Sequence, residues 1–131
     1  MFPDSLRALL IRPLIVRLAT LDADGYPHVV PIWFGVDGED ILFMSDRETA
    51  KVRNALARPK GAVSIGGDHA DEAGYLIRGD LSVYDDIGHA VAHQLLYHYE
   101  TPARAHELAA EWANDDIVVI RLKPTKITQI R

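Results

Sequence analysis

Hydroxyl groups and cations cluster between positions 45 and 54, where the sequence predicts the start of a helix. Thr49 contributes a hydroxyl, Lys51 a mobile positive charge, and Arg53 a guanidinium group that can bind two phosphate oxygens at once. The first turn of a helix adds unpaired backbone N–H groups and a partial positive charge. Together these groups suit a phosphate monoester or diester. The alternative is that Lys51 and Arg53 are ordinary solvated charges on an exposed helix.

A flat apolar wall is predicted beside that phosphate site, on the strand that carries Pro31 and Trp33. Such a wall suits an aromatic ring system, whereas the alternative places Trp33 in the core. Trp112, Tyr75 and His28 are further candidates to wall a substrate, with core or interface packing as their alternative. No side chain stands out as a nucleophile, so the catalytic residues stay unknown.

The histidines and one acidic loop are weaker candidates for a metal site. His89 and His93 are four residues apart on a predicted helix, so both rings could face one zinc or haem iron. A complete site needs a third ligand, and no His-Glu-x-x-His pattern is present. The acidic run over 68–72 is expected to be a solvated loop. The prediction is therefore solvent-facing histidines and no metal site.

Composition limits the function classes. The chain has 131 residues, a net charge of −5 and no cysteine, which suits one domain over 1–131 without disulfides or thiolate metal sites. The negative charge argues against nucleic-acid binding. No run of 18 apolar residues is present, and the first residues lack the pattern of a signal peptide. We therefore expect no membrane span and a cytoplasmic location.

Period-two and period-3.6 patterns predict the elements that must position these residues. Strands are expected over the following ranges: 14–21, 28–36, 41–45, 61–66, 75–84, 117–122 and 126–130. Helices are expected over 4–11, 46–58, 86–99 and 101–113. Ser45 or Asp46 is expected to cap the second helix, with Glu48 completing a capping box. Mostly local hairpins favour a mainly β antiparallel barrel with helical additions over a parallel α/β fold.

Four segments of the chain resemble, in the right order, the pyridoxamine-5′-phosphate-oxidase-like proteins with an FMN-binding split barrel. They are the first hairpin over 18–34, the Thr-Ala-Lys-Val-Arg-Asn helix over 49–54 with its Arg-Pro exit at 58–59, the strand over 75–79, and the closing strand over 117–126. Each segment is degenerate alone, whereas four in register are fairly specific.

The resemblance implies a six-stranded antiparallel Greek-key split barrel that forms a two-fold homodimer, with two cofactors in the grooves between subunits. It places Ser45, together with Thr49 and Lys51 of the Thr49-Ala50-Lys51 motif, on the cofactor phosphate. Arg53 is an addition to this set. The strand around Val30 to Trp33 and the end of the next at Met44 would line the ring. The full set of cofactor-binding residues implied is Val30, Pro31, Ile32, Trp33, Met44, Ser45, Thr49, Ala50, Lys51 and Arg53.

Two cofactors remain open, namely FMN and the 8-hydroxy-5-deazaflavin coenzyme F-420. The expected function is a flavin-dependent oxidoreductase that transfers hydride to or from a small organic substrate. The true oxidases of pyridoxamine phosphate carry an Arg-rich strand where this chain has Pro31-Ile32-Trp33, and a C-terminal substrate-binding segment that is not found before Arg131. We therefore do not expect that activity. The alternative is a non-catalytic protein that binds or carries a flavin or haem on the same barrel.

Overall fold

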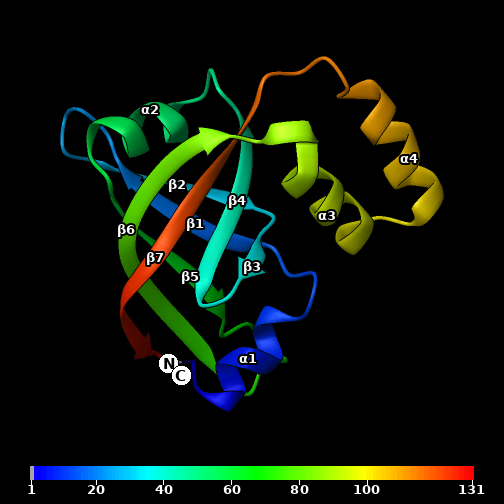
Figure 1. The fold of residues 1–131 in the computed structure, drawn as a ribbon. Coiled ribbons are helices and arrows are strands. Elements are labelled where there is room, and N and C mark those ends of the chain that lie inside the picture. Colours follow the sequence, from blue (N-terminus) through cyan, green and yellow to red (C-terminus); the bar gives the residue numbers. More distant parts are fainter. Residues whose placement is uncertain (1) are drawn as a thin grey trace.

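The computed structural model describes residues 2–131, which form one antiparallel sheet with short helices around it (Figure 1). The strands are β1 (Val16–Leu21), β2 (Pro27–Ile32), β3 (Gly35–Asp37), β4 (Asp40–Asp46), β5 (Lys60–Gly66), β6 (Gly74–Asp85) and β7 (Ile117–Gln129). The helices are α1 (Asp4–Leu10), α2 (Ala50–Ala57), the 3₁₀ turn η1 (Ile87–His89), α3 (Ala90–Tyr99) and α4 (Pro102–Glu111). The mainly β, antiparallel prediction is confirmed.

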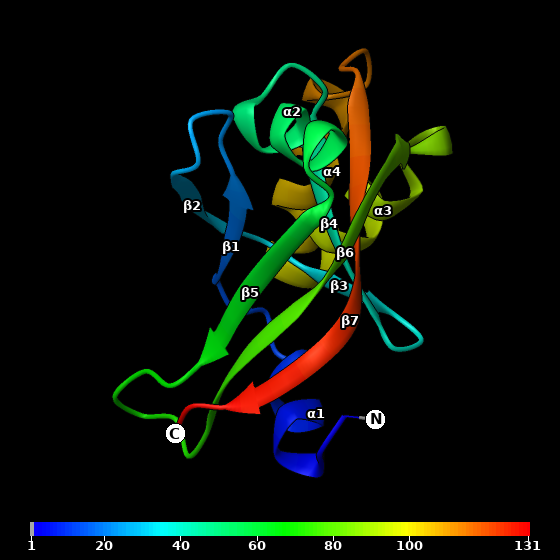
Figure 2. The ribbon, with the colours of Figure 1, turned by 90° about the vertical axis from the view of Figure 1, so that its left-hand side faces the viewer.

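The strand order across the sheet is β2-β1-β5-β6-β7-β4-β3, and every neighbouring pair is antiparallel. Local hairpins join β1 to β2, β3 to β4, and β5 to β6, whereas β1–β5 and β4–β7 pair segments far apart in the sequence. Figure 2 shows the long strands β6 and β7 curving from α1 toward α2 and α3. This curvature wraps the sheet around the core.

Alternating side chains of β6 supply the centre of that core. Tyr75, Ile77 and Leu81 are buried along one face of the strand, as the period-two pattern predicts. Leu6 and Leu9 of α1 pack into the same hydrophobic cluster and cover one end of the sheet (Figure 1). No helix within residues 2–131 is both long enough and apolar enough to cross a membrane.

A close approach between β6 and β7 marks the point where the sheet bends. The register shifts between Arg78, opposite Lys126, and Gly79, opposite Pro124, so that β7 carries one extra residue there. A Cβ atom at Gly79 would lie 2.2 Å from the carbonyl oxygen of Lys123. The bulge therefore requires a residue without a side chain at position 79.

The six strands implied by the resemblance are one too few, and two of the expected strand assignments differ from the structure. The strand expected over 28–36 is divided into β2 and β3, whereas those expected over 117–122 and 126–130 are one continuous strand, β7. The chain leaves the ladder after Ile32, and Phe34 turns into the core with 2% of its surface exposed. The N–H group of Phe34 donates to the Tyr99 hydroxyl rather than to a neighbouring strand. Seven strands result.

The predicted start of the second helix is also wrong. The helix begins at Ala50 rather than Asp46, and Thr49 occupies its N-cap position without a capping side-chain bond. Ser45 donates its hydroxyl to the carbonyl of Asp46, so the expected capping box does not form. By contrast, Thr101 caps α4 as its Thr-Pro sequence suggests, by accepting from the N–H of Arg104.

Candidate functional site

A polar pocket of about 290 Å³ lies between the end of β4, the start of α2 and the segment that leads into β7. Its lining residues are Met44, Ser45, Asp46, Thr49, Lys51, Trp112, Asp115 and Ile117. Residues 44–51 reach it because β4 ends where α2 starts, which puts strand and helix residues on one wall. We call this the polar pocket.

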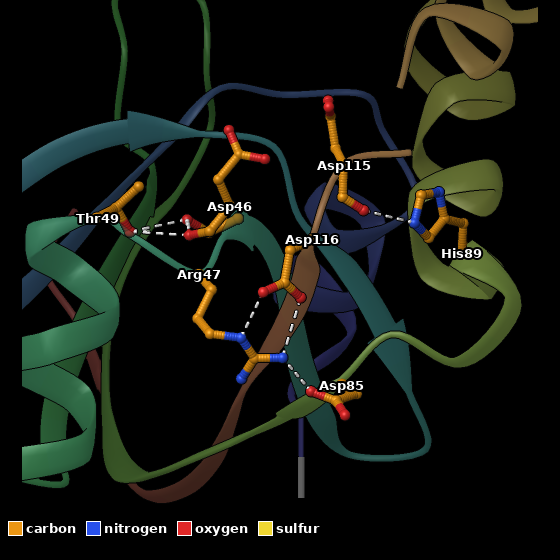
Figure 3. Close-up of polar contacts among 8 residues, drawn as sticks. Asp46, Arg47, Thr49, Asp85, His89, Asp115 and Asp116 are labelled. Carbon is orange, nitrogen blue, oxygen red and sulfur yellow. Dashed lines mark hydrogen bonds and ion pairs between the residues drawn. The ribbon is translucent and has the colours of Figure 1, made fainter. Parts of the chain in front are cut away.

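The two hydroxyls of the polar pocket are held by one short turn between β4 and α2 (Figure 3). The Ser45 and Thr49 oxygens lie 2.9 Å apart, and both can donate to the carbonyl oxygen of Asp46, at 2.8 and 3.2 Å. The turn therefore presents two fixed hydroxyl groups beside the first turn of α2.

Lys51 is the cation of the polar pocket. Burial lowers the pKa of its ammonium group, and the Asp46 carboxylate partly opposes that shift. Lys51 forms no ion pair with a carboxylate of residues 2–131. Asp46 and Asp115 also line the pocket, but both are exposed, so solvent and salt screen their repulsion of an anion. A half-buried ammonium with two hydroxyls suits a phosphate group.

Arg47 is not among the lining residues of this pocket and points toward Asp116 and Asp85 (Figure 3). Its guanidinium donates to both carboxylate oxygens of Asp116, at 2.7 and 3.0 Å, and also pairs with Asp85. The Nε2–H of His89 donates to the carbonyl of Asp115 at 3.1 Å. These bonds tie the segment before β7 to β4 and to the start of α3.

An apolar pocket of about 600 Å³ adjoins the polar one. Its lining residues are Ile15, Pro31, Ile32, Trp33, Met44, Glu100, Leu108 and Trp112. Met44 and Trp112 line both pockets, so the two lie side by side, and we call them together the groove. One end of the groove is polar and cationic, and the other is aromatic and aliphatic.

Tyr99 fixes the wall of the apolar pocket. Its ring stacks on Trp33 with centroids 4.6 Å apart and planes 8° from parallel. Its hydroxyl donates to the carbonyl of Leu14 at 2.7 Å and accepts from the N–H of Phe34 at 3.0 Å. Burial raises the pKa of this hydroxyl, and the bond from Phe34 opposes the shift. These bonds join Leu14, Phe34 and Tyr99. Each of them is next in sequence to a residue that lines the apolar pocket, namely Ile15, Trp33 or Glu100.

Most of the residues implicated by the sequence meet in the groove. Those that line it are Pro31, Ile32, Trp33, Met44, Ser45, Thr49 and Lys51. Val30 packs against the core, Ala50 lies in the first turn of α2 outside both linings, and Arg53 is exposed outside them.

Of the proposed substrate walls, Trp33 and Trp112 line the apolar pocket, whereas Tyr75 is core and bonds to Ser5. His28 lies partly buried on β2 with its Nδ1 atom unpartnered among residues 2–131.

The groove also contains residues that the sequence did not single out. These are Ile15, Asp46, Glu100, Leu108, Asp115 and Ile117. One signal was available, because Leu108 and Trp112 are four residues apart and therefore share a helix face. The others come together through tertiary packing alone.

The histidine pair does not have the geometry expected of it. His89 precedes α3 in a left-handed conformation with φ of 54°, so His89 and His93 are not separated by one helical turn. Within residues 2–131, no group of three His, Cys, Asp or Glu side chains could hold a metal ion. In the acidic loop, Asp71 pairs with Arg12 at 3.3 Å.

Asn54 anchors α2 against the β1–β2 hairpin. Its buried amide nitrogen donates to the Thr20 hydroxyl at 3.1 Å and to the Asp22 carboxylate at 2.7 Å. We expect Asn54→Ala to lower the free energy of unfolding by about 1–3 kcal/mol, because two partners lose their donor in a buried site. Urea unfolding followed by circular dichroism measures this change. Asn114→Ala, in an exposed turn, is the control, and an Asn54 variant as stable as it would contradict the anchor.

Comparisons with known proteins agree with this geometry. A family model described as pyridoxamine 5′-phosphate oxidase matches residues 2–131. A solved structure named F420 Reductase is 30% identical and superposes with a TM-score of 0.78, covering 97% of this chain and 98% of that one. General Stress Protein 26 from Bacillus anthracis str. Sterne is 18% identical, with a TM-score of 0.72 over 97% of this chain and 92% of that one. The fold is that of a split barrel.

Curated relatives match a shorter part. A pyridoxine/pyridoxamine 5′-phosphate oxidase from Pseudomonas paraeruginosa is 35% identical over 67 residues, which are 49% of this chain and 31% of the relative. A protein of the same name from Ectopseudomonas mendocina is 37% identical over the same shares. The match thus spans about a third of the length of these relatives.

Proposed function

The chain belongs to the pyridoxamine 5′-phosphate oxidase family, and from this premise we propose that it is an oxidoreductase with a flavin-type cofactor in the groove. One observation carries the proposal. The polar pocket around Lys51 and the apolar pocket around Trp33 lie side by side and share Met44 and Trp112 as lining residues. A flavin-type cofactor has the same two parts, a flat fused ring and a side chain that carries phosphate.

The lining residues suit those two parts. The Ser45 and Thr49 hydroxyls and the Lys51 ammonium would bind the phosphate, while Ile32 and Met44 would pack against the ring. The two tryptophans would exclude water from the ring, which strengthens every polar contact inside. When bound, such a ring supplies the hydride chemistry, and the protein supplies orientation and electrostatics.

FMN and the deazaflavin coenzyme F-420 both have this shape. The family resemblance supports FMN. The 30% identical structure named F420 Reductase, matched over nearly all of both chains, supports the deazaflavin. A second reading, a carrier that binds the cofactor without turnover, has the same groove and differs only in activity.

We also propose that the protein is a homodimer. The outward face of the β1–β2 hairpin exposes Ile15, Leu21 and Val29, at 49%, 40% and 57% of their surfaces. Pro31 is exposed on β2 as well, and both Ile15 and Pro31 line the apolar pocket. An exposed apolar face of this kind suits an interface between subunits. A second copy placed there would lie at the edge of the groove and close it.

The first test is a titration of purified protein with FMN and, separately, with coenzyme F-420, followed by ligand fluorescence. Saturable binding of one cofactor, then reduction of a quinone acceptor with the reduced cofactor as donor, is the expected result. Saturable binding without turnover on a broad panel of acceptors would favour the carrier. Binding of neither would overturn the proposal.

Light scattering of the same sample tests the assembly. The expected mass is twice the 14.6 kDa of the chain. A mass of one chain at micromolar concentration would contradict the homodimer.

A further inference from the structure

We infer that the apolar pocket takes a flat aromatic substrate that is uncharged or positively charged, and that Glu100 sets this preference. The inference rests on the proposed function: with the cofactor ring against Ile32 and Met44, the substrate would lie in the rest of the apolar pocket, beside Glu100. Glu100 follows α3 and lies where the chain turns toward α4.

The lining of the apolar pocket carries one charged group. Seven of its eight residues are apolar, two of these are tryptophans, and the eighth is Glu100. The nearest cation of the groove, Lys51, lines the polar pocket, where the proposed phosphate would neutralise it. An anionic substrate in the apolar pocket would therefore meet a carboxylate and no positive partner.

The Glu100 carboxylate is available to a ligand. Its side chain forms no hydrogen bond or ion pair with any other group of residues 2–131. Its backbone is held, since its N–H donates to the carbonyl of Leu96 at 2.9 Å and the preceding Tyr99 is bonded to Leu14 and Phe34. A carboxylate at the edge of an apolar pocket attracts a cation and repels an anion that enters the pocket.

The aromatic wall favours the same ligands. The faces of Trp33 and Trp112 attract cations as well as flat apolar rings. A planar cation gains from both the tryptophans and Glu100, a neutral ring gains from the tryptophans alone, and a planar anion is repelled. A pocket that repels anions would bind a phosphorylated substrate poorly, because such a substrate carries negative charge.

Calorimetric titration of the cofactor-loaded protein with three flat probes tests the inference. The probes are N-methylphenazinium as the cation, menadione as the neutral ring and 1,4-naphthoquinone-2-sulfonate as the anion. The expected order of affinity is cation, neutral, anion, with about tenfold or more between the first and the last. Glu100→Gln is expected to reduce that spread to about threefold, because it removes the charge and keeps the size of the side chain.

Glu111→Gln is the matched control, because Glu111 is an exposed carboxylate at the end of α4 outside the groove. It is expected to keep the full spread. Equal affinities in the unaltered protein, no binding of any probe, or an undiminished spread in Glu100→Gln would each overturn the inference. If the cofactor itself fails to bind, the proposed function is overturned. The same titrations of cofactor-free Lys51→Ala protein, with and without Glu100→Gln, then decide the charge preference, because no phosphate neutralises Lys51.

Discussion

Gly79→Ala is expected to be the most destabilising single substitution considered, lowering the free energy of unfolding by about 3 kcal/mol. The added methyl group would lie 2.2 Å from the Lys123 carbonyl oxygen and 2.9 Å from a methyl of Leu122. A flexible side chain could move aside, but the carbonyl belongs to the β7 ladder. Relief therefore requires β6 and β7 to separate at the bulge where the sheet bends.

Thermal unfolding measures the effect, which corresponds to a drop of about 10 °C in Tm for a domain of this size. Gly35→Ala is the matched control within a strand. Its Cβ would meet the end of the Leu95 side chain at 3.0 Å, and that methyl group needs to move by only a few tenths of an ångström. We expect less than about 1 kcal/mol there. Equal Tm values for the two variants would show that the close approach at Gly79 does not matter.

Lys51→Ala is expected to weaken binding of the phosphate-bearing cofactor about 10- to 100-fold. This range corresponds to the loss of one charged hydrogen bond in a partly desolvated site, about 1–3 kcal/mol. Lys51 is the cation that lines the polar pocket, beside the hydroxyls of Ser45 and Thr49. Calorimetric titration with the cofactor identified in the first test measures the change.

Two controls isolate the phosphate contact. Arg53→Ala removes a cation from the same helix, but Arg53 is exposed and lies outside the groove, so its affinity should stay within about twofold. The phosphate-free ring compound, riboflavin if FMN binds or 8-hydroxy-5-deazariboflavin if F-420 binds, should bind Lys51→Ala as well as it binds the unaltered protein. An equal loss with the phosphate-free compound, or with Arg53→Ala, would place the phosphate elsewhere.

The sequence predicted most of the sheet because its strands have local signals. The alternation through Tyr75, Ile77 and Leu81 defines β6, and the Asp-Gly turns after β1 and β3 define their hairpins. The break between β2 and β3 has no such signal. Apolar residues continue through Trp33 and Phe34, and the break depends on a bond to Tyr99, 65 residues further along the chain.

The candidate site shows the same division between local and long-range information. Residues 44–51 are consecutive, so a strand that runs into a helix was enough to predict their convergence. Glu100 and Leu108 reach the groove only because α3 packs against β3 and β4 and α4 packs against α3, and no spacing in the sequence predicts that packing. Arg53 was grouped with Lys51 by proximity, yet a separation of two residues turns side chains to different faces of a helix.

The groove is assembled from segments between Ile15 and Ile117, so it exists only when nearly the whole chain is folded. Any ligand it holds is therefore thermodynamically linked to folding, because the unfolded chain offers no comparable site. At a free concentration one hundred times its Kd, such a ligand adds about 2.7 kcal/mol to the free energy of unfolding. Thermal denaturation can thus rank cofactors and substrates by affinity without knowledge of the reaction.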